Sequence, residues 1–139
     1  MPSDANAARR DAARLASTIF FLDYQIGRYT VAEALRAAGA RVDVHIDHFP
    51  QASPDIEWIP EVGRRDWVLI TKDKNIRRNP LERAAYKKAK LRGFVLTGTD
   101  MGGKESADLL VRCLPGMIRR VANRRGPLLF TISRRAMLS

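Results

Sequence analysis

The segment Thr18-Ile-Phe-Phe-Leu-Asp23 gives the clearest indication of the fold, because it is a short apolar run that ends on an acid. A second run of the same kind, Trp67-Val-Leu-Ile-Thr71, is followed two residues later by Asp73. Short apolar runs of this length are typical of strands that are buried on both faces. Both segments therefore predict buried strands, each with an aspartate at or just beyond its carboxyl end.

Outward from these segments, predicted strands alternate with predicted helices along the chain. The strands are expected over residues 18–23, 41–46, 67–71, 93–97 and 128–133, and the helices over 29–38, 54–63, 80–92 and 104–123. Ser53 is the expected N-cap of the second helix, and Pro60 is expected to end or kink it. This alternation predicts an α/β fold: one domain with a mostly parallel sheet of about five strands and helices on both faces. Residues 1–16 are predicted to be a flexible Ala/Arg-rich lead-in to a domain over 17–139.

Composition excludes several classes of protein. The 139 residues contain one cysteine, so an internal disulfide framework is excluded and a reducing cytoplasm is the expected location. A membrane-spanning helix needs roughly 20 apolar residues, and no such run is present. The Arg-rich start has no apolar stretch, so it does not resemble a secretory signal.

Charge is distributed unevenly between the two halves of the chain. Residues 1–63 carry six basic and nine acidic side chains, whereas residues 64–139 carry nineteen and six. A strongly basic half attracts polyanions, of which RNA and DNA are the obvious candidates. The sequence therefore indicates an acidic site beside a track for a nucleic acid.

The acids near strand ends predict a metal site. In an open parallel sheet, ligands bind at the carboxyl ends of the strands, where Asp23, Asp47 and Asp73 are expected. Asp55, at the start of a helix, can point to the same place. Converging carboxylates repel one another unless a cation balances them, and hard oxygen ligands suit Mg²⁺ or Mn²⁺. Such a site can activate water for the cleavage of a phosphodiester.

Several pieces of the sequence resemble the PIN-domain nucleases, and in particular the VapC-type toxins of bacterial toxin–antitoxin pairs. They are the strand end Phe21 to Asp23, HFP (48–50), DIEWI (55–59), TKDKNIRRNP (71–80) and the pair Glu82-Arg83. Their order and spacing carry the resemblance, which covers roughly residues 18 to 133. It implies that residues 17–139 form a PIN-like nuclease domain.

The resemblance also implies a mechanism and a set of site residues. Asp23, Asp55 and Asp73 would hold Mg²⁺ or Mn²⁺, and water would attack an RNA phosphodiester. PIN nucleases usually carry a further acid on a helix, but Glu33 lies about 200° round its helix from Val31 and faces away. Asp47 is the preferred substitute, and the neutral Asn75 stands where the family often has another acid.

The resemblance implies a metal-dependent endoribonuclease, the toxin of a type II pair, with RNA as substrate and a cognate antitoxin as partner. A homodimer stays open. Basic residues beside Asp73 are expected to contact RNA: Lys72, Lys74, Arg77 and Arg78. The rival interpretation is a catalytically inactive PIN-like module that binds RNA or a protein, which the neutral Asn75 favours.

Three other interpretations of the same residues are weaker. Residues 98–104 fit the spacing of a phosphate-binding P-loop, but Glu105 replaces the hydroxyl residue that should hold Mg²⁺. His45, Asp47 and His48 lack the spacing of a transition-metal site. A phospho-acceptor receiver domain would need a second acid beside Asp23, where Tyr24 stands. Cys113 lies on the apolar face of a predicted helix and is expected in the core.

Overall fold

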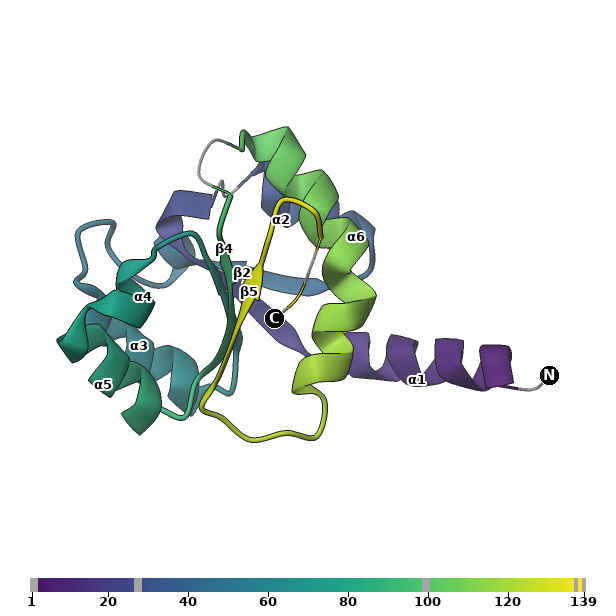
Figure 1. Ribbon diagram of the computed structural model, residues 1–139, viewed down its shortest axis with the longest axis horizontal. Coiled ribbons are helices and arrows are strands. Elements are labelled where there is room, and N and C mark those ends of the chain that lie inside the picture. The colour runs from purple at the N-terminus through teal and green to yellow at the C-terminus, as the bar shows by residue number, and fades with distance from the viewer. Residues whose placement is uncertain (1–2, 27–28, 99–100, 137, 139) are drawn as a thin grey trace.

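The computed structural model describes residues 3–26, 29–98, 101–136 and 138, and shows a single five-stranded sheet between two layers of helices (Figure 1). The strands are β1 (Ile19–Leu22), β2 (Arg41–Val44), β3 (Val68–Thr71), β4 (Arg92–Leu96) and β5 (Leu128–Ile132). The α-helices are α1 (Ser3–Ser17), α2 (Thr30–Ala37), α3 (Asp55–Arg64), α4 (Asn75–Arg78), α5 (Pro80–Lys88) and α6 (Gly103–Val121). Two short 3₁₀ turns are η1 (Tyr24–Ile26) and η2 (His45–Asp47).

All neighbouring strands pair in parallel, in the order β2-β1-β3-β4-β5. The chain runs from β1 to one edge of the sheet and then returns to add β3 on the other side of β1. The carboxyl ends of β1 and β3 therefore flank the point where the strand order reverses, which is the usual position of a ligand site in open α/β sheets. The predicted α/β class and the five parallel strands are confirmed.

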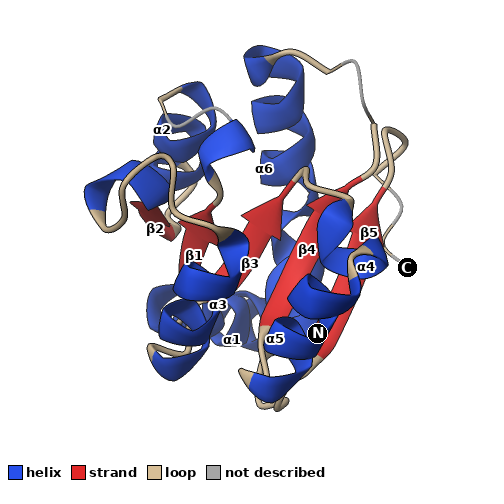
Figure 2. Ribbon diagram, turned by 90° about the vertical axis from the view of Figure 1, so that its left-hand side faces the viewer, coloured by secondary structure: helices blue, strands red, loops and turns tan. Residues whose placement is uncertain are grey.

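The two faces of the sheet bury separate cores. Helices α2 and α6 cover one face, and α3, α4 and α5 cover the other (Figure 2). Alternate residues of β1 divide between them: Phe20 and Leu22 join the first core, and Phe21 joins the second. Strands buried on both faces lose the polar alternation of a half-exposed strand, which explains the continuous apolar runs in the sequence. Cys113 is buried in the first core, as predicted.

The predicted loose lead-in is instead the helix α1. Alanine and arginine have high intrinsic helix propensity, so this composition favours a helix wherever one face finds a contact. Leu15 packs against the first core, and Asp11 pairs with Arg119 of α6 at 2.6 Å. These two contacts hold α1 to the body near its carboxyl end, while its first turns extend away from the sheet (Figure 1).

Other observed element boundaries differ from the predicted ones by a few residues. Helix α5 ends at Lys88 because Lys90 adopts a positive φ of 53°, so Arg92 begins β4 rather than ending the helix. Pro54, not Ser53, occupies the N-cap of α3, and the helix continues through Pro60 to Arg64. The predicted loop after β3 contains the short helix α4. Among the described residues, no helix is both long and apolar enough to cross a lipid bilayer.

Candidate active site

Three aspartates predicted as ligands lie at the carboxyl end of the sheet. Asp23 follows β1 directly, Asp73 follows β3 by two residues, and Asp55 opens α3. Parallel pairing of β1 with β3 brings the first two to the same edge. An acid in the first turn of a helix also interacts favourably with the helix dipole, so an aspartate at position 55 is favoured even without a metal.

Asp23 is held from two sides. Its Oδ2 accepts a hydrogen bond from the Thr71 hydroxyl at 2.7 Å, and its Oδ1 accepts one from the Tyr24 backbone N–H at 2.6 Å. The side chain is only 6% exposed, and burial raises the pKa of Asp23 to about 6, with a further rise from the charges of Asp55 and Asp73. The two hydrogen bonds oppose that rise, because they favour the ionised form. Asp23 is therefore oriented as an acceptor while its charge remains unbalanced.

Thr71 connects the two strand-end acids. Its hydroxyl oxygen accepts a hydrogen bond from the Asp73 backbone N–H at 2.9 Å while donating to Asp23. The Asp73 carboxylate in turn accepts a hydrogen bond from the Asn75 backbone N–H at 2.9 Å. Burial raises the pKa of Asp73, and the neighbouring Asp55 raises it further. The threonine thus fixes the turn that aims Asp73.

Asp55 is positioned by its own helix. The Trp58 indole N–H donates to Asp55 Oδ1 at 3.0 Å, and Trp58 is only 1% exposed. A tryptophan three residues along a helix lies on the same face, so this contact is a direct result of the sequence spacing. The buried ring makes the hydrogen bond rigid and fixes the position of the Asp55 carboxylate.

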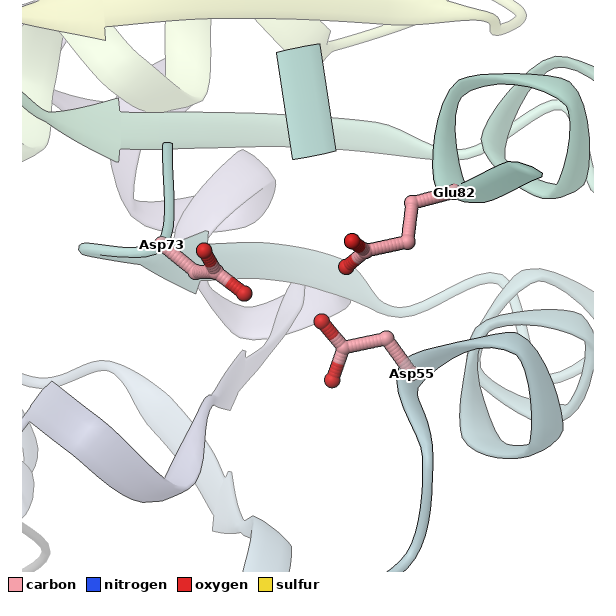
Figure 3. A group of neighbouring side chains, drawn as sticks. All are labelled: Asp55, Asp73 and Glu82. Atoms are coloured by element: carbon pink, nitrogen blue, oxygen red, sulfur yellow. The ribbon is translucent and has the colours of Figure 1, made fainter. Parts of the chain in front are cut away.

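Glu82 is a fourth acid that reasoning from the sequence did not place in the site. It projects from the first turn of α5, and its carboxylate faces those of Asp55 and Asp73 (Figure 3). One oxygen from each of these three residues lies within 4.8 Å of the others. Burial, a hydrogen bond with Asp55 and the charges of the three aspartates raise the pKa of Glu82 to about 8.

The sequence held only a weak signal for Glu82, which was the pair Glu82-Arg83 among the pieces that resemble VapC-type toxins. Asn79 caps α5 by accepting hydrogen bonds from the backbone N–H groups of Leu81 and Glu82. An acid at this position is usually explained by the helix dipole alone. Its burial, at 8% exposed, depends on the packing of α5 against α3, which the local sequence does not show.

The donor set fits a divalent cation. Three carboxylates offer oxygens close together, and Glu82 Oε1 is buried without a hydrogen-bond partner in the described structure. A buried, unpartnered carboxylate oxygen is costly unless a proton or a cation binds it. The adjoining cavity of about 260 Å³ is lined by these acids and by Asn75, Asn79 and Leu81. Mg²⁺ and Mn²⁺ prefer such oxygen ligands.

The remaining predicted site residues lie around this group. Asn75 lines the same cavity, so it stays a predicted ligand. Asp47 is exposed in η2, because β2 ends at Val44 instead of continuing to Ile46. It lies outside the group of described acids whose oxygens lie within 4.8 Å. Asp47 as a ligand also stays a prediction.

The predicted RNA-contacting cations differ in their surroundings. Lys72 Nζ donates to the backbone carbonyl of Met101 at 3.2 Å, which ties the end of β3 to the loop before α6. Lys74 is half-buried, whereas Arg77 and Arg78 of α4 are exposed. The two arginines are therefore free to meet a ligand in a way that Lys72 is not.

The weaker interpretations gain no support from the described residues. His45 is 2% exposed and lies among aromatic rings, with its ring 5.7 Å from that of Trp58. Burial lowers the pKa of His45, which favours the neutral form. His45 and His48 belong to no group of metal ligands in the described part of the chain. The P-loop-like segment includes Thr99 and Asp100, which lie outside the described residues.

Comparison with known proteins identifies the class to which this fold and site belong. A family model described as "PIN like domain" matches residues 18–98. The chain therefore belongs to the PIN-like domain family. It is also 30% identical over 116 residues to the Mycobacterium tuberculosis (strain ATCC 25618 / H37Rv) protein named "Putative ribonuclease VapC45". That alignment covers 81% of this chain and 83% of the relative. No solved structure gives a significant match.

Proposed function

We propose that this protein is a divalent-metal-dependent endoribonuclease and the toxin of a type II toxin–antitoxin pair. The observation that carries the proposal is the convergence of Asp55, Asp73 and Glu82 within 4.8 Å, with Asp23 beside them at the strand-reversal point. Membership of the PIN-like family and similarity to a protein named as a VapC ribonuclease support the same activity. RNA is the proposed substrate and a VapB-type antitoxin the proposed partner.

The residues of the site have different proposed roles. Asp55, Asp73 and Glu82 would hold the cation, for which Mg²⁺ or Mn²⁺ is proposed. When bound, a divalent cation supplies charge stabilisation at the phosphoryl oxygens and lowers the pKa of water. Asp23 adds negative charge next to this group, and its hydrogen bonds from Thr71 and Tyr24 fix its position. Trp58 and Thr71 orient the carboxylates so that little movement is needed when a cation binds.

The buried Glu82 oxygen favours an active enzyme over an inactive binding module. A module that only binds RNA has no use for four acids next to a basic surface, since they repel phosphate. Retaining them costs stability, because burial and mutual repulsion raise the pKa values of Asp23, Asp73 and Glu82. That cost is explained if the acids serve a cation.

The proposal is tested with Asp73→Asn. This substitution keeps the shape of the side chain and removes one charge from the site. Wild-type protein should cleave RNA in Mg²⁺ or Mn²⁺, lose activity in EDTA, and arrest growth when expressed without its antitoxin. Asp73→Asn should cleave at least about 100-fold more slowly, which corresponds to about 2.7 kcal/mol in the barrier.

RNA binding and melting temperature provide the controls. Asp73→Asn should fold and still bind RNA, since the basic surface is unchanged. Wild-type protein that cuts none of a broad set of RNAs in either metal would refute the nuclease. An Asp73→Asn variant as active as wild type would show that cleavage occurs elsewhere.

A further inference from the structure

A groove beside the acidic site combines cations with an apolar floor. We call it the α5–β5 groove; it has a volume of about 330 Å³ and is lined by Ile76, Arg77, Arg83, Lys87, Pro127 and Leu129. Tyr86 forms part of its base, where its hydroxyl donates to the Leu128 carbonyl. The three cations come from two short helices, and Arg83 and Lys87 lie four residues apart on one face of α5.

Among the described residues, the cations of this groove have no ion-pair partners. Arg77, Arg83 and Lys87 are all exposed, and none forms an ion pair or a side-chain hydrogen bond within the described residues. Other arginines behave differently: Arg92 donates to the Val121 carbonyl at 2.8 Å, and Arg119 pairs with Asp11 at 2.6 Å. The groove therefore concentrates positive charge that the fold itself does not use.

The groove and the acidic cavity share no lining residue, but α4 and α5 supply residues to both. Arg77 comes two residues after Asn75, which lines the acidic cavity, and Arg83 directly follows Glu82. In Figure 2, α4 and α5 lie in front of β4 and β5, on the sheet face that also carries α3. A polyanion with one phosphate at the acidic site would therefore have its neighbouring phosphates within reach of this groove.

We propose that the α5–β5 groove binds the single-stranded RNA that flanks the cleaved bond. The inference rests on the proposed function and extends it, because it assigns the surface that binds the RNA beside the cleaved bond. Arg77, Arg83 and Lys87 contact phosphates. The apolar floor of Ile76, Pro127 and Leu129 accepts a nucleotide base, which is exposed only when the RNA is unpaired.

An acidic protein segment is the competing occupant, and the groove favours RNA over it. Carboxylate side chains would satisfy the cations, but the acids of the nearby site, of which Glu82 directly precedes Arg83, repel them. An RNA strand whose scissile bond lies at the acidic site must extend from that site in both directions. The three cations of the groove, which have no ion-pair partner among the described residues, can each contact a phosphate of its backbone.

Neighbouring lysines on the last turn of α5 provide a matched test. Lys87 lines the groove, whereas Lys88 lines the opposite surface between α3 and α5 together with Ile56 and Pro60. Both are exposed and lie at the same end of the helix, so Lys87→Glu and Lys88→Glu change the net charge and the helix dipole alike. Only their direction relative to the groove differs.

Affinity is measured by fluorescence anisotropy with a labelled, mixed-sequence, single-stranded RNA of about 20 nucleotides, in EDTA so that it stays intact. Lys87→Glu should weaken binding about five- to tenfold and lower the slope of log affinity against log salt by about 0.7, as expected for one lost phosphate contact on a single strand. Lys88→Glu should weaken binding less than about twofold. Lys87→Gln should have an intermediate effect, and melting curves should show that all variants fold.

The outcomes separate this proposal from the proposed function. Equal RNA affinity of Lys87→Glu and Lys88→Glu, with wild type still cleaving RNA, would overturn the groove and leave the nuclease intact. The same would follow if Lys87→Glu lost binding only to an acidic peptide, or if wild type bound the annealed duplex as tightly as the single strand. Wild-type protein that binds RNA through Lys87 but never cleaves it would overturn the nuclease and support the groove.

Discussion

The two ends of the sheet carry opposite charges, and these charges differ in whether they are paired with other groups of the protein. At the carboxyl end, four acids gather, and none forms an ion pair within the described residues. At the amino end, a cavity of about 750 Å³ is lined by five cations: Arg14, Lys90, Arg92, Arg124 and Arg125. Most of these have partners in the protein, as Arg92 does with the Val121 carbonyl and Asp66.

The difference follows from the direction of the helices. Helices α1, α3, α5 and α6 end at the amino edge of the sheet, where their last carbonyls need donors and their dipoles favour cations. Arg92 and Arg124 meet that need, since Arg124 donates to the Arg120 carbonyl at 3.1 Å. Charge that is satisfied within the fold indicates a structural role. Charge left unsatisfied, as at the carboxyl edge, indicates a ligand.

The largest effect that would sharpen this comparison is expected for Glu82→Gln. The substitution keeps size and polarity but removes the charge of a group whose oxygen has no partner in the described structure. Cleavage should fall at least about 100-fold at saturating Mg²⁺ or Mn²⁺, a change of about 2.7 kcal/mol or more. Steady-state rates on a fixed RNA measure it. Near-normal cleavage would show that Glu82 is not part of the site.

The cations at the amino edge should behave in the opposite way. Arg92→Met should leave cleavage chemistry alone and lower the free energy of unfolding by about 1–2 kcal/mol, because the Val121 carbonyl loses the Arg92 donor and keeps only the Arg124 backbone N–H at 3.3 Å. Urea denaturation measures this loss. Arg125→Met is the matched control: Arg125 lines the same cavity but forms no ion pair with another described residue, so its effect should stay within about 0.5 kcal/mol. Equal effects would contradict a structural role for Arg92.

The pH dependence of the metal-free protein tests the acidic end. Because the pKa values of Asp23 and Glu82 are raised to about 6 and about 8, the folded protein binds more protons than the unfolded chain. Stability should therefore be greatest below the ordinary carboxyl pKa near 4 and fall as the pH rises toward about 8. The expected loss is several kcal/mol, since each unit of pKa difference corresponds to about 1.4 kcal/mol, and Mg²⁺ should reverse it.

The control for the pH experiment is Glu82→Gln without metal, which should be less sensitive to pH than wild type and more stable than it near the upper end of the range. Thermal or urea unfolding at several pH values, with and without Mg²⁺, provides the measurement. A metal-free wild type that becomes more stable with rising pH would mean that the acids are not mutually repulsive.

The sequence could predict the sheet and the strand-end acids because both depend on local patterns. Phe21 and Leu69 lie in continuous apolar runs, which are typical of strands that are buried on both faces. Asp23 and Asp73 come directly or shortly after these runs. Asp55 could be found from its place in the first turn of a helix. These features need no knowledge of which elements touch.

What the sequence could not give depends on contacts between distant elements. Glu82 reaches the site only because α5 packs against α3, and its burial is invisible in its neighbours. Asp47 was expected at a strand end, but β2 ends at Val44 and Asp47 lies in the 3₁₀ turn η2 that follows. Helix α1 depends on the pairing of Asp11 with Arg119, which is 108 residues away in the sequence, and on the packing of Leu15 against the first core.

The smallest predicted effect concerns how Asp55 is held. Trp58→Phe keeps an aromatic ring in the second core but removes the indole N–H that donates to Asp55 Oδ1 at 3.0 Å. A less fixed carboxylate binds a cation more weakly, so the Mg²⁺ or Mn²⁺ concentration for half-maximal cleavage should rise about three- to tenfold. This corresponds to the roughly 1 kcal/mol of a single hydrogen bond. The rate at saturating metal should change little, because the cation restores the position of Asp55.

Trp67→Phe distinguishes this positioning role from a loss of packing. Trp67 belongs to the same core and stacks on Phe21 with ring centroids 5.5 Å apart, but in the described structure no hydrogen bond joins it to an acid of the site. Both substitutions should therefore lower the melting temperature, and only Trp58→Phe should raise the metal requirement. If the two variants shift the metal requirement equally, the effect comes from the core as a whole, and the charge at the carboxyl end is positioned by packing instead of by a specific donor.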